Sequence, residues 1–308
     1  MIKVFIDGQA GTTGLQLKSK IINHPYVELI EIDDDKRKDT CERQRLMNES
    51  DVVFLCLPDA AAIEAAKLVT NPKTLIIDAS TAHRTNDSWT YGFPELSQEH
   101  YQAIKNSKRI ANPGCHASGF ISIVYPLVSS GIMPSSYPVT SHSITGYSGG
   151  GNKMIAEYET EDRLEEIGTP RQYGLTQKHK HLPEMKKVTG LDNEPVFSPI
   201  VSDYYCGMAV SVPIYTTLLN KKMSADELFD FFSDYYKDSE FISVHKAPEN
   251  GFLSPLGLEG TNKMEIHVCG NEDRVIITSV FDNLGKGASS AAIENMNIAM
   301  GFDISTAL

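Results

Sequence analysis

Several features are scarce in this 308-residue sequence, and each absence narrows the class of protein. The five cysteines are scattered and form no C-x-x-C pair, so neither a disulfide framework nor a cysteine zinc site is indicated, and a reducing compartment fits best. No apolar run approaches the length of a membrane span, and the N-terminus runs directly into a strand pattern without a signal-peptide design. We therefore expect a cytoplasmic protein with no membrane partner.

Positive charge is also in short supply. The chain has 28 Lys and Arg against 40 Asp and Glu, a net charge of −12, which argues against a nucleic-acid surface and against binding to anionic lipid. A local basic funnel for a phosphorylated substrate stays compatible with this balance. The hydrophobic content of 41% is that of an ordinary globular protein, and the length favours two domains.

The N-terminal stretch has the pattern of a strand, a glycine-rich turn and a helix. An apolar run over Ile2–Ile6 precedes Gly8, Gly11 and Gly14, and a helical pattern follows over Leu15–Ile22. The glycine spacing is G-x-x-G-x-x-G and not the commoner G-x-G-x-x-G, but it still permits a tight turn and a close approach of backbone to a pyrophosphate. An ordinary strand-to-helix turn is the alternative; we favour a dinucleotide site.

The next strand pattern, Tyr26–Ile32, ends in charges of both signs. The acidic triplet Asp33–Asp35 stands where a carboxylate would bind a ribose 2′-hydroxyl, which favours NAD. Lys36, Arg37 and Lys38 follow at once and could bind the 2′-phosphate of NADP. A solvated turn explains all six residues equally well, so these residues alone leave the cofactor open.

Further apolar runs follow over Asp51–Leu57, Thr74–Asp78 and Lys108–Ala111, with an alanine-rich helical pattern over Ala60–Val69 between the first two. This alternation predicts a doubly wound parallel sheet, in which ligands gather at the carboxyl ends of the strands. Arg84 comes just past one such end and could clamp a phosphate or carboxylate, although an arginine on the surface is an equal alternative.

The sequence Asn112-Pro113-Gly114-Cys115 follows the last of these strands and opens a predicted helix over 115–125. A thiol on the first turn of a helix lies where unpaired N–H groups favour the reactive thiolate. Cys115 is therefore the candidate nucleophile. The competing interpretation is a small buried hydrophobic residue, which is common for free cysteine.

Beyond this point strand-like segments in hairpin spacing surround two helical patterns, near Ile155–Ile167 and Ala225–Tyr236. This indicates a second, α+β domain with a largely antiparallel sheet. Small residues open a last helix that ends at Met300 and could pack back on the first domain. We predict a dinucleotide-binding domain of residues 1–115 completed by residues 285–308, and a catalytic domain of residues 116–284.

Two motifs in the second domain could bear on chemistry. Ser148-Gly149-Gly150-Gly151 is typical of an anion-binding turn or of a plain linker. His179 and His181 are two residues apart and cannot share one helical face, which gives a metal site little support. A histidine held in a turn by Pro183 is instead a plausible general acid/base.

Several of these stretches together resemble one family, the shorter form of N-acetyl-gamma-glutamyl-phosphate reductase of arginine biosynthesis, which is similar in fold to aspartate-semialdehyde dehydrogenase. Asn-Pro-Gly-Cys at 112–115 and His-x-Pro-Glu at 181–184 are its specific motifs, whereas the glycine motif alone would not identify it. The resemblance covers nearly the whole chain. Its further parts are the N-terminal glycines, 55–59, 78–80 with Arg84, 91–96, and 282–284 with 286–288.

The resemblance implies an NADPH-dependent reduction of N-acetyl-L-glutamyl 5-phosphate to the 5-semialdehyde and phosphate, through a thioester on Cys115 and with His181 as the acid/base. It favours NADP over NAD. The cofactor residues it implies are Gly8, Gly11, Thr12, Thr13, Gly14, Lys36, Arg37, Ser80, Asn283 and Lys286; the substrate residues are Arg84, Asn112, Ser148 and Gly149, and no metal is expected.

Three other functions remain open on the sequence. A reductase of another acyl phosphate, aspartyl or carrier-linked glutamyl, would keep every motif. A thiol hydrolase or acyltransferase would use Cys115 with His181 but would not need the glycine turn. A nucleotide-sensing protein would keep the glycines and treat Cys115 as filler. We also expect a homo-oligomer, a dimer or a tetramer, although no residue pattern specifies its size.

Overall fold

The computed structural model describes all 308 residues, which form two compact units. The first unit comprises residues 1–114 and 288–308, and the second comprises residues 115–287. The sequence-based boundaries lie at 115 and 285. None of the helices combines the length and the apolar character needed to cross a bilayer.

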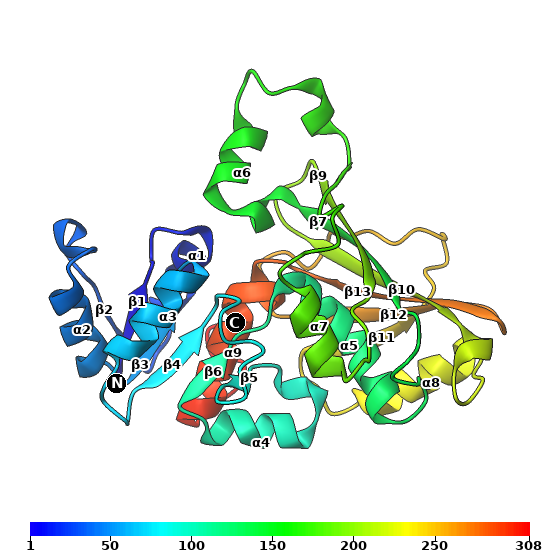
Figure 1. Ribbon diagram of the computed structural model, residues 1–308, viewed down its shortest axis with the longest axis horizontal. Helices are drawn as coiled ribbons and strands as arrows, with labels where there is room; N and C mark the ends of the chain where they lie inside the picture. Colours follow the sequence, from blue (N-terminus) through cyan, green and yellow to red (C-terminus); the bar gives the residue numbers. More distant parts are fainter. The chain divides into compact units, whose positions relative to one another are not determined.

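The first unit contains a six-stranded sheet in the order β2-β1-β3-β4-β6-β5, and every pairing in it is parallel (Figure 1). The inner strands β3 and β4 are buried along their whole length, as continuous apolar runs in a doubly wound sheet should be. The strands are β1 (Ile2–Asp7), β2 (Val27–Ile30), β3 (Val52–Leu55), β4 (Leu75–Asp78), β5 (Thr90–Tyr91) and β6 (Arg109–Ala111).

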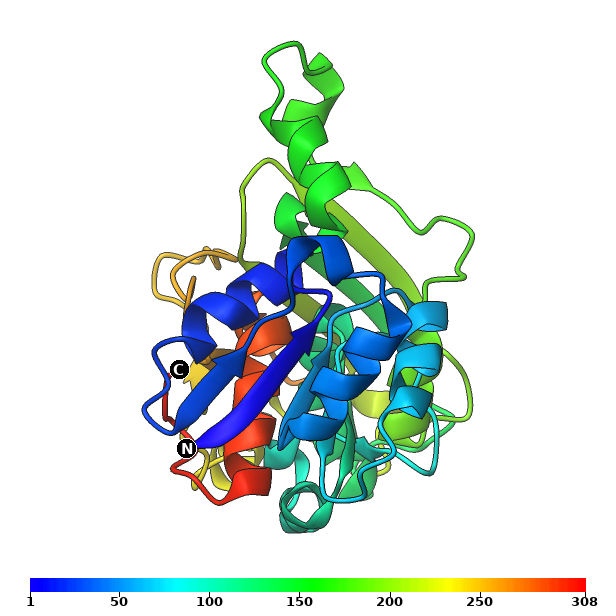
Figure 2. The same cartoon turned by 90° about the vertical axis from the view of Figure 1, so that its left-hand side faces the viewer.

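Helices cover both faces of this sheet. One hydrophobic cluster joins the sheet to α1, α4 and α9, and a second joins its other face to α2 and α3. Figure 2 shows the red C-terminal helix α9 running beside the blue strands of this unit. The bounds are α1 (Thr12–Ile21), α2 (Thr40–Glu49), α3 (Asp59–Leu68), α4 (Gln98–Asn106) and α9 (Ser290–Met300).

The second unit contains a seven-stranded mixed sheet in the order β11-β12-β13-β10-β7-β9-β8. Four of its pairings are antiparallel and two are parallel, so the predicted α/β fold with a second, largely antiparallel domain is confirmed. The strands are β7 (Thr140–Gly146), β8 (Arg171–Gln172), β9 (Val196–Ser202), β10 (Met208–Tyr215), β11 (Ile242–Lys246), β12 (Met264–Gly270) and β13 (Arg274–Phe281).

Four helices belong to this unit, and α5 and α8 pack on its sheet. The helix expected over Ile155–Ile167 is shorter than predicted, because α6 ends at Glu159 and a separate 3-10 turn, η4 (Glu165–Gly168), follows. The helices are α5 (Cys115–Ser129), α6 (Gly151–Glu159), α7 (Leu182–Thr189) and α8 (Ala225–Tyr235).

Helix α5 runs further than the sequence suggests. We expected it to end at Tyr125, before Pro126, but it continues through the proline to Ser129. Proline has no N–H to donate to the carbonyl group four residues earlier, which is that of Ser122. The hydroxyl group of Tyr236 donates to this carbonyl oxygen at 2.7 Å. The acceptor that the proline leaves open is therefore satisfied, and the helix can continue.

Candidate functional site

A cavity of about 270 Å³ lies at the carboxyl ends of β1 and β3. The chain places β2 and β3 on opposite sides of β1, so this is the point where the strand order reverses, and open α/β sheets bind ligands there. Apolar walls come from Ile32 and Leu57, and the charged residues in its lining are Arg37, Lys38, Arg43 and Asp7. The cavity thus combines an apolar slot with cationic groups.

The three glycines of the turn have different reasons to be glycine. Gly8 has φ +91°, and a methyl group there would collide with the carbonyl oxygen of Cys56. A methyl group on Gly14 would collide with the carbonyl oxygen of Gly8. Gly11 has an ordinary φ of −77°, and the nearest atom to its missing Cβ is 3.6 Å away, so the protein itself does not demand glycine. A ligand that approaches the backbone at the start of α1 would require glycine at position 11.

This arrangement fits a dinucleotide. Helix α1 begins at Thr12 and continues through Thr13, and its N-cap residue Gly11 supplies no side-chain hydrogen bond to the first turn. The N–H groups at a helix start and the positive end of the helix dipole suit a pyrophosphate. Of the sequence-predicted residues, Gly8 lines the cavity, and Gly11, Thr12, Thr13 and Gly14 follow it at the start of α1.

The basic residues that line this cavity are not the predicted pair, Lys36 and Arg37. Arg37 lines the cavity and pairs with Asp34 at 2.5 Å, and Lys38 lines it without an ion-pair partner. Lys36 pairs with Asp33 at 3.3 Å and does not line the cavity. The basic residues that could meet a 2′-phosphate are therefore Arg37 and Lys38.

Sequence reasoning missed Arg43, which α2 directs into the same cavity. Its guanidinium donates to both carboxylate oxygens of Asp7, at 2.6 and 3.2 Å. Asp7 is 6% exposed and ends β1 beside the glycine turn, where an uncompensated negative charge would repel a phosphate. Arg43 neutralises it. No spacing rule links residues 7 and 43, so only the fold reveals this pair.

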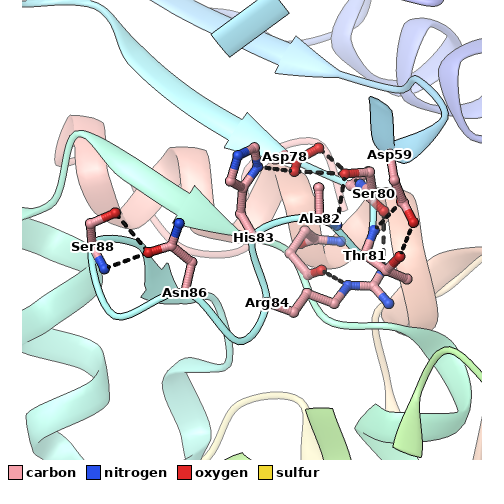
Figure 3. Close-up of polar contacts among 11 residues, drawn as sticks. Asp59, Asp78, Ser80, Thr81, Ala82, His83, Arg84, Asn86 and Ser88 are labelled. Atoms are coloured by element: carbon pink, nitrogen blue, oxygen red, sulfur yellow. Dashed lines mark hydrogen bonds and ion pairs between the residues drawn. The ribbon is translucent and has the colours of Figure 1, made fainter. Parts of the chain in front are cut away.

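The segment after β4 forms a closed polar network (Figure 3). The fully buried Asp78 carboxylate accepts hydrogen bonds from the Ser80 hydroxyl at 2.7 Å and from the Ser80 N–H at 2.9 Å. His83 contacts the same carboxylate at 2.6 Å and stacks on Trp89 with ring centroids 3.9 Å apart. The Ser80 hydroxyl is thus engaged within the protein, which favours a structural role over the predicted cofactor contact.

Arg84 and Asn112 stabilise the turn that leads to the candidate nucleophile. The buried Arg84 guanidinium donates to the carbonyl oxygens of Asn112 at 2.8 Å and Ala79 at 2.9 Å. The Asn112 amide donates to the Ala288 carbonyl oxygen at 2.9 Å and accepts from Asn295 at 3.2 Å. These contacts favour positioning of the backbone over the direct substrate contact that the sequence predicts.

In the second unit, Cys115 is the first residue of α5 and is partly exposed. Gly287 packs directly against it: a methyl group at Gly287 would lie 2.8 Å from the Cβ atom and 3.3 Å from the Cα atom of Cys115. Such close backbone approach requires glycine. The sequence motif around 286–288 therefore acts on the position of the cysteine.

Three histidines gather beside this helix start. The ring centroids of His116, His179 and His181 lie 4.8 to 5.7 Å apart, and Phe197 packs against the first two of these rings. His181 itself is 5% exposed and is the N-cap residue of α7. The expected turn thus proves to be a helix start, with Pro183 in its first turn.

His116 is held on both ring nitrogens. Its Nδ1 lies 2.6 Å from the hydroxyl oxygen of Ser143, and its Nε2 lies 2.7 Å from that of Tyr173. Burial lowers the pKa of His116 to about 3, and burial together with Lys180 lowers the pKa of His179 to about 4. Both rings are therefore neutral at physiological pH. No group of His, Cys, Asp and Glu side chains could hold a metal ion.

Tyr173 also belongs to this cluster, although no sequence pattern singles it out. Burial raises the pKa of its phenol, and negative charge at Cys115 raises the pKa further. The phenol therefore stays protonated and lies within electrostatic reach of the thiol. A tyrosine in a loop carries no sequence signal of this kind, so only the structure reveals it.

The remaining predicted site residues lie inside the second unit. Asn283 donates to the Ser148 hydroxyl oxygen at 3.1 Å and accepts from the Gly207 N–H at 2.8 Å. A methyl group on Gly149 would lie 3.4 Å from the same Asn283 amide nitrogen. Lys286 is buried, with its ammonium 5.3 Å from the centroid of the Phe241 ring. Asn283 and Ser148 therefore join two loops, which favours a structural role.

Each of the two units matches a known protein family. A family model described as the semialdehyde dehydrogenase NAD binding domain matches residues 3–104, and one described as the semialdehyde dehydrogenase dimerisation domain matches residues 115–283. The chain is 41% identical to the N-acetyl-gamma-glutamyl-phosphate reductase 2 of Nostoc sp. over 97% of both chains. It is 40% identical to the reductase of Chelativorans sp., over 97% of this chain and 98% of that one.

Solved structures support the fold. The aspartate semialdehyde dehydrogenase II of Vibrio cholerae, in complex with ASA, superposes with a TM-score of 0.71 at 14% identity and covers 98% of both chains. The NADP complex of aspartate semialdehyde dehydrogenase from Candida albicans superposes with a TM-score of 0.67 at 15% identity and covers 99% of both chains. At these identities the similarity extends to the architecture alone.

Proposed function

The chain belongs to the N-acetyl-gamma-glutamyl-phosphate reductase family, and we propose that it reduces N-acetyl-L-glutamyl 5-phosphate to N-acetyl-L-glutamate 5-semialdehyde with NADPH, in arginine biosynthesis. The observation that carries the proposal is the placement of Cys115 on the first residue of α5, next to a cluster of three histidines. A thiol there lies at the positive end of the helix dipole, which favours the thiolate. The substrate is inferred from the names of relatives that are about 40% identical over 97% of this chain.

The first step is an acyl transfer to Cys115. The thiolate attacks the carbonyl carbon of the acyl phosphate, the bond from that carbon to the phosphate oxygen breaks, and phosphate leaves with the bonding electron pair. A thioester on Cys115 remains. Arg84 acts indirectly here, because it holds the carbonyl group of Asn112 and so fixes the turn that presents the thiol.

The second step reduces the thioester and regenerates the thiol of Cys115. When bound, the reduced nicotinamide supplies the hydride that takes the thioester to the oxidation level of the aldehyde. His181 donates and recovers the proton at the oxygen of the resulting thiohemiacetal on Cys115, and the carbon–sulfur bond then breaks to release the semialdehyde. The neutral His116 cannot serve as the acid, because its ring nitrogens are already engaged and its pKa is about 3.

The cavity at the ends of β1 and β3 would hold the cofactor. Gly8, Gly11 and the first turn of α1 would meet the pyrophosphate, and Ile32 and Leu57 would flank the adenine. We propose NADP over NAD, because Arg37 and Lys38 both line the cavity whereas none of Asp33–Asp35 does. The first unit would thus be the dinucleotide domain and the second the catalytic domain.

The proposal is tested by loss of NADPH absorbance with a panel of acyl phosphates, including N-acetylglutamyl, aspartyl and carrier-linked glutamyl phosphate. We expect the N-acetylglutamyl compound to be the best substrate. Without NADPH, mass spectrometry should find one acyl group on Cys115, and Cys115→Ser should bind NADPH but lose nearly all turnover. Acylation with hydrolysis and no NADPH oxidation would indicate a thiol hydrolase instead.

We also propose that two copies associate through the open face of the seven-stranded sheet. The strand register places Ile144, Tyr215 and Ile276 on the face opposite to α5, and these side chains are 38%, 60% and 49% exposed. The family model for this unit is that of a dimerisation domain. Ile276→Asp should shift the protein to a monomer in analytical ultracentrifugation, whereas Ile63→Asp, an exposed residue of α3, should not.

A further inference from the structure

Two of the three clustered histidines, His179 and His181, lie in one loop. Residues 173–181, here called the histidine loop, connect the end of β8 to the start of α7. Residues 175–178 are exposed and belong to no helix or strand. At the start of the loop the N–H of Tyr173 donates to the carbonyl oxygen of Pro199 at 3.0 Å. The middle of the loop has a second attachment to β9, through Gln177.

Gln177 supplies that attachment with its side-chain amide. Its Nε2 donates to the carbonyl oxygen of Phe197 at 2.8 Å, and its Oε1 accepts from the N–H of Phe197 at 2.8 Å. Strand β8 pairs with β9 only at Val201 and Ile200, so Phe197 lies on the edge of β9 where no strand covers it. The amide of Gln177 therefore takes the place of a peptide group in a neighbouring strand and satisfies both polar atoms of a buried residue.

The backbone at Gln177 is shaped for this contact. Its φ is +54°, in the left-handed region that non-glycine residues rarely adopt, and Ala307 is the only other such residue in the chain. The N–H of Gln177 donates to the carbonyl oxygen of Gly174 at 3.0 Å, which closes the turn. Strain of this kind persists where surrounding contacts enforce it and is concentrated at functional sites. Here it directs the amide at β9.

The attachment reaches the histidine cluster through one ring. Phe197, whose backbone Gln177 holds, packs its side chain against His179 and His116 with centroid distances of 5.1 and 5.2 Å. His179 in turn lies 4.8 Å from His181. We propose that Gln177 is a positioning residue for the reduction: its amide fastens the histidine loop to β9 and so holds His181 in place beside His116 and Cys115. This rests on the proposed function for the role of His181.

Three variants test the length of the Gln177 side chain, its ability to donate a hydrogen bond, and the effect of a neighbouring control substitution. Gln177→Asn keeps an amide and the tolerance for left-handed φ but is one methylene too short to reach both atoms of Phe197. Gln177→Glu keeps the length, but an ionised carboxylate cannot donate to the Phe197 carbonyl oxygen. Lys178→Ala, at an exposed neighbour that makes no hydrogen bond, is the matched control.

Kinetics give the first measurement. Both Gln177 variants should lower kcat by about 10-fold to 100-fold, because a displacement of about 1 Å at a reacting group has an effect of this size. The acylation rate of Cys115 should stay unchanged, so KM for the acyl phosphate should fall together with kcat. The ratio of kcat for Gln177→Glu to that of the unchanged protein should rise as the pH is lowered toward the ordinary Glu pKa of about 4.3, since a protonated carboxyl group can donate and accept as the amide does. Gln177→Asn should show no such recovery.

Hydrogen exchange gives a measurement that does not depend on activity. The N–H of Phe197 should exchange at least about 10-fold faster in Gln177→Asn than in the unchanged protein and in Lys178→Ala. Unchanged exchange of Phe197 would show that the attachment does not exist. Faster exchange with an unaltered kcat would show that the loop is attached but that its position does not matter for the reduction. An unchanged protein without reductase activity would refute the proposed function, while the exchange result would still decide on the attachment.

Discussion

Gly287→Ala should displace the nucleophile without removing any catalytic group. The added methyl carbon would lie 2.8 Å from the Cβ atom of Cys115, whereas carbon atoms pack at about 3.5–4.0 Å. The carbonyl oxygen of Asp282 lies 3.2 Å from the same methyl carbon and limits its retreat. Cys115 must therefore move by about 1 Å, for which we expect a loss of about 100-fold in kcat.

The assay follows the acylation of Cys115 by N-acetylglutamyl phosphate in a single turnover, with mass spectrometry as the readout. Acylation should slow by about the same factor as kcat, and binding of NADPH should be retained. Overpacking of this size also costs about 1–3 kcal/mol in the free energy of unfolding, so thermal denaturation is measured alongside to establish that the variant is folded.

Gly168→Ala is the matched control. A methyl group there would lie 3.8 Å from the nearest atom, a carboxylate oxygen of Asp203, which is an ordinary contact distance. It should acylate and turn over as the unchanged protein does. If Gly287→Ala reacts as fast as this control, Gly287 does not set the position of the thiol and the reasoning from close approach is refuted.

The other predictions concern the acid/base, the cofactor and pH. His181→Asn should lower kcat by about 100-fold to 10,000-fold but leave acylation of Cys115 measurable by mass spectrometry. Lys38→Ala should raise KM for NADPH by about 10-fold and leave KM for NADH unchanged, since a charged hydrogen bond contributes about 1.5–3 kcal/mol; equal effects on both cofactors would place the 2′-phosphate elsewhere. Burial lowers the pKa of His116 from 6.5 to about 3, so between these pH values the unfolded chain binds more protons than the folded chain. The free energy of unfolding therefore decreases as the pH is lowered. Denaturant titrations should show His116 contributing about 2 kcal/mol of this loss between about pH 7 and pH 5, absent in His116→Phe.

Local patterns were enough to predict the frame of the molecule. The buried strands of the first sheet read as continuous apolar runs, and Pro-Gly before Cys115 marked both the turn and the helix start. Helices α2 and α4 were missed because both are polar surface helices whose apolar stripe is narrow. Helix α7 was missed because Pro183 suggested a turn, although proline is equally at home in the first turn of a helix.

The site could be predicted only where one residue type carries the chemistry by itself. Cys115 and His181 have such chemistry, and the glycines have a distinctive spacing. Arg43, Tyr173 and Gln177 act through partners that are distant in the sequence, and no periodicity links those partners before the chain folds. The same limit explains Ser80 and Asn112, whose polar groups looked available in the sequence but are engaged by the protein itself.

Because Tyr236 donates to the Ser122 carbonyl oxygen that Pro126 leaves open, substitutions at positions 126 and 236 should depend on each other. Tyr236→Phe should be harmful in this chain, because it leaves the Ser122 carbonyl without the donor that Pro126 cannot supply. In a background carrying Pro126→Ala, the amide at 126 donates to that carbonyl, and the same Tyr236→Phe change should become nearly neutral. Drift at position 126 would thus release the tyrosine from selection, whereas losing the tyrosine first would weaken the helix that carries Cys115. The order in which the two substitutions arise decides which path a descendant of this chain can follow.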